Sequence, residues 1–224
     1  MFEKEIDMQE LLYKKYKSNP KNIVLKEFNG RFGNVDIVKV KMNNNNILNE
    51  QALLLSQQRF AFTVSFLHKN SKRTLDYLMR KTGYSRTIQL SILKRLINEK
   101  IVFKDENCYY LHKNFVYPKI IFDSYELKLK DWKKALSQAI KNLEFSTFSW
   151  VVLPKEVCDN LKDETIRLYN EYGIGVLSLN TNGKTRIILK AKRNNNKALN
   201  NSAYIVSLNK FIIYQYKKYL LAKC

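Results

Sequence analysis

The residues with the clearest chemical potential are an aspartate, a glutamate and a lysine that lie far apart in the sequence. Asp36 lies in a run with the pattern of a β-hairpin, and Glu126 and Lys128 end a second apolar run. In a strand, positions 126 and 128 point to the same face, so both side chains can share one site while Leu127 packs on the other side. Carboxylates can hold a divalent ion against a scissile phosphate, and a nearby cation can orient the attacking water. The three residues therefore predict metal-dependent hydrolysis of a phosphodiester.

Sequence context separates this acid-x-Lys triplet from a second one. Asp131, Trp132 and Lys133 have the same spacing, but Asp131 stands directly before a helical pattern and has the properties of its N-cap. Glu126, in contrast, ends a run of apolar residues that is typical of a strand. We therefore expect only Glu126 and Lys128 to have the platform that a catalytic site needs.

This order of elements resembles the PD-(D/E)XK nuclease superfamily, the fold shared by many restriction enzymes, Holliday-junction resolvases and repair nucleases. The resemblance covers a leading helix at about 2–17, the hairpin with Asp36, the strand with Glu126, and the helix and strands to about 191. It implies an α/β fold, a restriction-endonuclease-like mixed sheet flanked by helices. It also implies that Asp36 and Glu126 hold Mg²⁺ or Mn²⁺, that the Leu127 carbonyl completes the metal shell, and that Lys128 orients the water.

Four further residues could belong to such a site. Members of the superfamily commonly carry a glutamine on the helix after the lysine, and Gln138 stands near the edge of the apolar stripe of the helix expected at 131–143. They often carry a glutamate on the first helix, for which Glu5 and Glu10 are alternatives, although acids there also favour the positive helix N-terminus. Glu27 could help to bind the metal or could be a solvent-facing edge residue.

The long interval between Asp36 and Glu126 has the pattern of an inserted domain. A helical stretch from Ile47 to about His68 precedes two helices broken at Gly83, and residues 101–112 alternate and turn as a β-hairpin would. This order resembles a winged helix-turn-helix, whose third helix enters the major groove of DNA, although winged helices also bind proteins. The residues expected to contact DNA are Arg86, Thr87, Gln89, Lys94 and Arg95.

These patterns divide the chain into three parts. Residues 1–45 and 116–192 are expected to form the nuclease-like core, 46–115 the winged-helix insertion, and 193–224 an Asn-rich linker and a C-terminal helix. The apolar and aromatic period of that helix favours packing on the core or against a partner copy, which leaves a homodimer open.

Composition points to a nucleic-acid partner. A net charge of +20 and a pI near 9.8 favour polyanions, although some of the lysine excess accompanies a general enrichment in Lys, Asn and Ile. The three cysteines and two histidines are scattered, which argues against structural zinc, a cysteine nucleophile or a Ser-His-Asp triad. Neither a long apolar run nor a signal peptide is evident, so we expect a cytoplasmic protein without a membrane segment.

Two functions follow from these features. The first is a metal-dependent DNA endonuclease that cuts duplex or branched DNA and grips it with the winged helix. The alternative is a non-catalytic DNA-binding regulator or recombination accessory factor on a nuclease-like scaffold. A complete Asp, Glu and Lys set favours the first, because a scaffold has no chemical need for it.

Overall fold

A computed structural model divides the chain into two compact units, each discontinuous in sequence. The first contains Met1–Asn43 and Ile120–Asn196, and the second contains Asn44–Lys119 and Lys197–Cys224. The expected boundary at 45–46 lies outside the described residues, as does most of the Asn-rich linker. The residues that the structure describes are 2–30, 33–42, 50–117, 120–195 and 202–221, with side chains to Gln215 in the last range.

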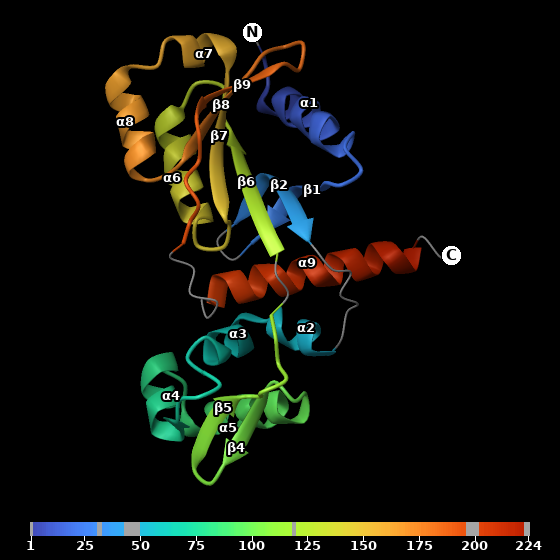
Figure 1. The fold of residues 1–224 in the computed structure, drawn as a ribbon, viewed down its shortest axis with the longest axis vertical. Helices are drawn as coiled ribbons and strands as arrows, with labels where there is room; N and C mark the ends of the chain where they lie inside the picture. Colours follow the sequence, from blue (N-terminus) through green and yellow to red (C-terminus); the bar gives the residue numbers. More distant parts are fainter. Residues whose placement is uncertain (1, 31–32, 43–49, 118–119, 196–201, 222–224) are drawn as a thin grey trace. The chain divides into compact units, whose positions relative to one another are not determined.

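The first unit is an α/β domain built on a six-stranded mixed sheet (Figure 1), which confirms the expected α/β class with a mixed sheet. The strand order is β1-β2-β6-β7-β8-β9, in which β2 is antiparallel to both of its neighbours, β1 and β6, while β6, β7 and β8 are parallel and β9 is antiparallel to β8. The elements are α1 (Glu5–Lys17), β1 (Ile23–Asn29), β2 (Asn34–Met42), β6 (Ile120–Leu127), α6 (Trp132–Asn142), β7 (Phe148–Pro154), α7 (Lys155–Asp159), α8 (Asp163–Glu171), β8 (Gly175–Leu179) and β9 (Thr185–Leu189).

Helices cover both faces of this sheet. Met8 and Leu12 of α1 pack on one face, against side chains that include Ile37 and Leu127. On the other face α6, α7 and α8 bury a second cluster, in which Tyr169 of α8 is fully buried. The central strand β6 is therefore buried almost along its length, as its apolar sequence requires.

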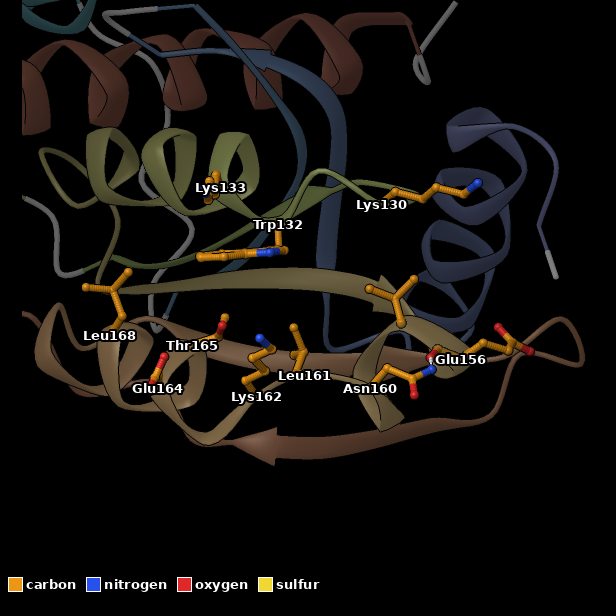
Figure 2. A pocket seen from close by; sticks show the side chains of 11 residues that line it. Lys130, Trp132, Lys133, Glu156, Asn160, Leu161, Lys162, Glu164, Thr165 and Leu168 are labelled. Carbon is orange, nitrogen blue, oxygen red and sulfur yellow. Dashed lines mark hydrogen bonds between the residues drawn. The ribbon is translucent and has the colours of Figure 1, made fainter.

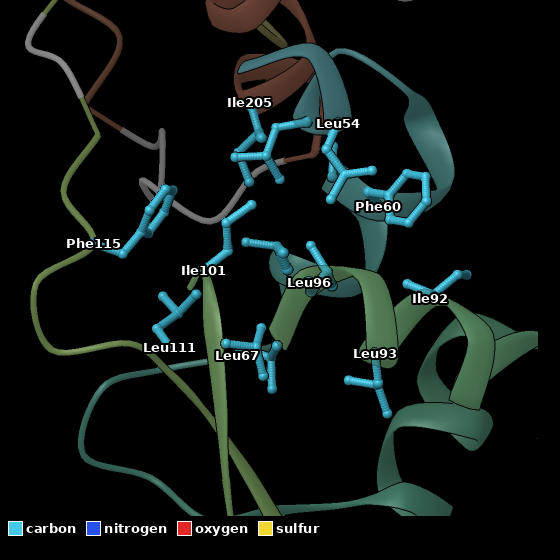
Figure 3. Packing of buried hydrophobic residues seen from close by; sticks show 14 of the residues in the cluster. Leu54, Phe60, Leu67, Ile92, Leu93, Leu96, Ile101, Leu111, Phe115 and Ile205 are labelled. Carbon is cyan, nitrogen blue, oxygen red and sulfur yellow. The ribbon is translucent and has the colours of Figure 1, made fainter. Parts of the chain in front are cut away.

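The second unit combines helices with a small three-stranded sheet of order β3-β5-β4. Its core is formed by apolar side chains of the helices and the hairpin, such as Leu54, Phe60 and Leu96, together with Ile205 of the C-terminal helix (Figure 3). The elements are α2 (Glu50–Leu55), α3 (Gln58–Val64), β3 (Arg73–Thr74), α4 (Leu75–Thr82), α5 (Arg86–Asn98), β4 (Val102–Asp105), β5 (Cys108–Leu111) and α9 (Ser202–Leu221).

The C-terminal helix differs from the expectation. We expected 193–224 to form a segment of its own, with the helix packed on the nuclease-like core or on a partner copy. Helix α9 instead contacts α2 and α3 of the second unit, where Ile205 and Val206 are buried. The reason is that α2 and α3 leave apolar side chains such as Leu55 that need a cover.

The helical stretch expected at 47–68 and the region 155–172 each contain two helices in place of one. The stretch 47–68 contains α2 and α3, and Ser56 between them donates its hydroxyl to the Leu53 carbonyl at 2.8 Å. The stretch 155–172 contains α7 and α8, and Asn160 donates its amide to the Glu156 carbonyl at 2.7 Å. In both cases a polar side chain takes a carbonyl that would accept a backbone N–H in a continuous helix, and the helix ends there.

Among the described helices, none is both long and apolar enough to cross a membrane.

The geometry of β2 and β6 predicts that the first unit folds without the second. Met42 and Ile120 are paired residues of neighbouring antiparallel strands, so a two-residue Asn-Gly turn can join them in place of 43–119. We expect such a chain, ended at Asn195, to unfold cooperatively in chemical denaturation followed by circular dichroism. A non-cooperative transition would show that the first unit needs the second to fold.

Candidate active site

The pairing of β2 with β6 brings the two central acidic residues, Asp36 and Glu126, together. Strand β2 pairs with β6 in a register that sets Ile37 opposite Tyr125, so the preceding residue, Asp36, stands opposite Glu126. The strands that carry Asp36 and Glu126 are thus neighbours in one sheet. Because directly opposed residues point to the same face, the two carboxylates share one side of the sheet.

Asp36 is held by the end of β6. Its Oδ2 accepts a hydrogen bond of 2.7 Å from the backbone N–H of Leu127. Burial raises the pKa of the Asp36 carboxyl, and the charge of Glu27 adds to this, while the Leu127 N–H and the Lys128 ammonium act in the opposite direction without cancelling it. The neighbouring groups therefore do not fully compensate the negative charge of the Asp36 carboxylate.

The Glu126 carboxyl is buried, and only one of its oxygens is hydrogen-bonded within the described part of the chain. Its Oε1 accepts a hydrogen bond of 2.6 Å from the Asn142 amide. Within the described part of the chain, the buried Oε2 has no hydrogen-bond partner. Burial and, second, the charge of Asp36 raise the pKa of Glu126 from its ordinary 4.5 to about 7, against the lowering effects of Asn142 and Lys128.

Asn142 is a site residue that the sequence analysis missed. It ends α6, is buried, and continues the stripe of Ala135 and Ala139 that faces the sheet. A backbone carbonyl of Asn142 also accepts from the Ser146 hydroxyl at 2.6 Å, and Ser146 in turn accepts from Ser124 at 2.9 Å. The available signal was a polar residue at a core position of an apolar helical stripe, which marks a buried hydrogen bond.

Gln138, the predicted glutamine, lies one helical turn before Asn142 on the same face of α6. It is half-buried, and its Oε1 is a buried oxygen without a hydrogen-bond partner among the described residues. Gln138 therefore borders the face of α6 that carries Asn142.

Lys128 connects the end of β6 to the first helix. Its ammonium is largely buried and donates to Glu5 Oε2 at 2.9 Å and to the Leu127 carbonyl at 2.8 Å. Burial alone lowers the pKa of Lys128, but the hydrogen bond to Glu5 and the charges of Asp36, Glu5 and Glu126 outweigh it and leave the pKa raised. Lys128 is thus a firmly protonated cation beside two carboxylates. The Leu127 carbonyl, an expected metal ligand, here accepts this ammonium.

The structure distinguishes between the two acids of the first helix. Glu5 pairs with Lys128, whereas Glu10 forms an ion pair with Lys26 on the surface. Glu5 is therefore the acid of α1 that belongs to the site.

Glu27 stands in line with the two central carboxylates. In the register of β1 and β2 it lies level with Asp36, between the pairs Lys26–Ile37 and Phe28–Val35, and its side chain is exposed. Its φ of 49° is a left-handed conformation that is uncommon for a residue with a side chain. Gln9 of α1, a second residue missed from the sequence, donates its amide to Glu27 Oε1 at 2.6 Å and to the Asp36 carbonyl at 2.9 Å.

Asp36 and Glu126 fit a divalent cation. The half-buried Asp36 carboxylate stands opposite the buried Glu126 carboxylate, both have a raised pKa, and Glu126 carries a buried oxygen without a hydrogen-bond partner among the described residues. A bound cation supplies the charge that each lacks. In the described ranges, no group of three His, Cys, Asp or Glu side chains converges on a common point. The protein ligands would therefore be the two carboxylates, with waters completing the shell, as Mg²⁺ prefers.

Helix α5 presents most of its predicted DNA-contact residues to solvent. Arg86, Thr87, Lys94 and Arg95 are exposed. Gln89 is a correction, because its side chain is fully buried and its Oε1 accepts from the Thr82 hydroxyl at 2.9 Å. The helix phase explains this, since position 89 precedes the buried Ile92 and Leu93 by three and four residues and faces the core with them.

Comparison with known proteins identifies no relative of this chain. No protein-family model, curated protein or solved structure matches the chain.

The raised pKa of Glu126 predicts a pH-dependent stability. A folded-state pKa of about 7 against an ordinary 4.5 means that the folded state binds the proton more tightly, so this contribution is present below pH 4.5 and is lost as the pH rises through about 7. In chelator, Glu126→Gln should therefore gain stability over the parent protein between these limits, by a total on the order of 3 kcal/mol. Urea denaturation across this pH range measures the difference.

Glu10→Gln is the matched control, because it removes a carboxylate of α1 that lies outside the site. Its stability difference from the parent should stay nearly constant from pH 5 upward. A Glu126→Gln difference that is equally flat would show that Glu126 titrates normally.

Proposed function

We propose that this chain is a metal-dependent DNA endonuclease with the PD-(D/E)XK type of site. The observation that carries the proposal is the pair of carboxylates on neighbouring strands, the half-buried Asp36 and the buried Glu126, with the protonated Lys128 beside them. Two carboxylates that each lack positive charge favour a divalent cation, and an adjacent ammonium favours a phosphate oxygen or the attacking water.

Each residue has a separate part in the proposed reaction. Mg²⁺ or Mn²⁺, bound by Asp36 and Glu126, would supply the charge that polarises the scissile phosphate and acidifies a bound water. The Leu127 N–H and the Asn142 amide hold one oxygen of each carboxylate, and so orient the other oxygens. Lys128 stabilises negative charge that develops on the phosphate, and Glu5 fixes the direction of its ammonium.

The order of elements supports the family assignment. The first helix, the hairpin β1–β2, the strand β6 that carries the acid-x-Lys triplet, the helix α6 and the parallel strand β7 follow one another as the resemblance implies. Glu5 on the first helix and Gln138 on α6 also occupy the two accessory positions. Gln138 borders the Asn142 face of α6. From there its side chain can contact the substrate, and we do not propose it as a metal ligand.

The second unit supports DNA binding by a winged helix-turn-helix. Helices α4 and α5 are joined by a turn at Gly83, whose φ of 73° is the left-handed conformation that ends a helix, and Ser85 caps α5. Strands β4 and β5 follow as a hairpin, and β5 also pairs with β3, which gives the order β3-β5-β4. The exposed basic side chains of α5 are suited to the major groove, and the net charge of +20 favours attraction to phosphates.

The proposal predicts the effect of removing each central group on cleavage. Asp36→Ala or Glu126→Ala should abolish Mg²⁺- or Mn²⁺-dependent nicking of a plasmid, because each removes a metal ligand. Lys128→Ala should reduce the rate about a hundredfold or more, with DNA binding nearly intact.

Glu10→Ala is the control for the loss of an acid from the same unit and should cut at the parental rate. Full activity of the Glu126→Ala protein would refute the assignment. A parent protein that binds DNA but does not cut it with either metal would favour the alternative, a non-catalytic DNA-binding factor on this scaffold.

The winged-helix proposal predicts how α5 contributes to binding. Replacing Arg86 and Lys94 with Ala should weaken duplex binding by about 1 to 3 kcal/mol for each contact that reaches a base edge. Each lost phosphate contact should lower the slope of log K against log salt by about one. Gel-shift titrations at several salt concentrations measure both quantities.

The matched control is the double variant Lys72→Ala, Lys113→Ala, which removes the same charge from exposed positions of the second unit outside α5. Equal losses in the two double variants would mean that charge alone, and not the face of α5, determines binding.

A further inference from the structure

A second candidate site lies in the first unit, in a cavity of about 890 Å³ between the start of α6 and helices α7 and α8 (Figure 2). Its volume falls within the range of small-molecule sites, roughly 300–1,000 Å³. The cavity is lined by residues that lie two or three positions after the ends of the parallel strands β6 and β7, such as Lys130 and Glu156. In open α/β sheets, ligands bind outside the carboxyl ends of such strands.

The cavity has the shape of a slot with one aromatic wall. The ring of Trp132 lies with one face toward Leu161 and Thr165 across the cavity, and with Lys133 on its other side (Figure 2). The Lys133 ammonium lies 5.6 Å from the ring centroid. Leu161 and Leu168 supply apolar surface opposite the indole. A flat aromatic group fits between these walls better than a compact or charged one.

The polar lining suits a nucleotide. Lys130, Lys133 and Lys162 line the cavity, and within the described ranges none of them has an ion-pair partner. In Figure 2 the Lys162 ammonium points toward Trp132. Glu156 and Glu164 also line the cavity and can accept from the exocyclic amino group of a base. The lining therefore offers an aromatic platform, cations for a phosphate and acceptors for a base edge.

We propose that this cavity binds one unpaired deoxynucleotide, with its base stacked on Trp132 and its phosphate near Lys130 or Lys162. Lys130 follows Lys128 by two residues, so the cavity and the proposed catalytic site both contain residues at the carboxyl end of β6. A role of this cavity in substrate selection rests on the proposed endonuclease function. If that function holds, the substrate class is DNA with an unpaired nucleotide near the cut, such as branched or single-strand-containing DNA.

Fluorescence of Trp132 tests the cavity without catalysis. Trp132 and Trp150 are the two tryptophans of the chain, and Trp150 stacks on Tyr125 at 6.2 Å inside the unit. In buffer with chelator, we expect deoxyadenosine monophosphate to quench the Trp150→Phe protein, and 2-deoxyribose 5-phosphate, which has no base, to quench it far less. If Trp150→Phe does not fold, the difference between the parent protein and Trp132→Phe gives the same signal.

Binding of a short oligodeoxyadenylate then tests the residues. Trp132→Ala should weaken it by about five- to 150-fold, the range expected for one lost base stack. Lys162→Ala should weaken it severalfold, while Lys155→Ala, the same change at an exposed position of α7 outside the cavity, should not. Thermal denaturation checks that each variant is folded.

The outcomes separate this inference from the proposed function. Quenching by the mononucleotide without any metal-dependent cleavage would keep the nucleotide site and refute the endonuclease. Cleavage without quenching, or equal oligonucleotide binding by Trp132→Ala and the parent, would refute the nucleotide site and leave the endonuclease standing. Absence of quenching would also favour a side chain of a protein partner as the occupant of the slot.

Discussion

The antiparallel pairing of β2 with β6 joins two segments that are distant in sequence and fixes the register in which Asp36 stands opposite Glu126. A slip of one residue would turn Glu126 to the other face of the sheet, toward α1, and would separate it from Asp36 and Asn142. The hydrogen bond from the Leu127 N–H to Asp36 reinforces this register at the strand end. Because Met42 and Ile120 close the pair, the chain between them can form another unit without disturbing the site.

The same pairing creates an electrostatic conflict that the surrounding residues only partly relieve. A half-buried and a buried carboxylate stand side by side; burial raises the pKa of both, the charge of Glu27 adds to the rise at Asp36, and the charge of Asp36 adds to the rise at Glu126. Asn142, the Leu127 N–H and Lys128 lower the cost, and Glu5 and Gln9 hold Lys128 and Glu27 in place. The negative charge that these groups leave uncompensated is a physical reason for cation affinity. Without a metal, the two neighbouring carboxylates destabilise the folded state, and a bound cation removes this cost.

The sequence was sufficient for the parts of the fold and the site that follow from local patterns. Apolar runs indicated the strands, and the spacing of Glu126 and Lys128 placed both at the end of one strand. Asn142 and Gln9 were missed because their roles depend on which element packs above them, and sequence spacing alone does not reveal this. The assignment of Gln89 to DNA contact was wrong because its helix phase, set by Ile92 and Leu93, turns it inward. The packing of α9 on the second unit was equally hidden, because an amphipathic pattern shows a buried face but not its partner.

The most direct test of the central claim, a cation shared by Asp36 and Glu126, is a titration with Mn²⁺ followed by calorimetry near pH 8. The parent protein and Glu10→Gln should bind the ion with similar affinity, whereas Asp36→Asn and Glu126→Gln should each lose at least about tenfold, because each variant removes a charged ligand. Unchanged Mn²⁺ binding in both site variants would contradict the account and would show that these two carboxylates have only a structural role.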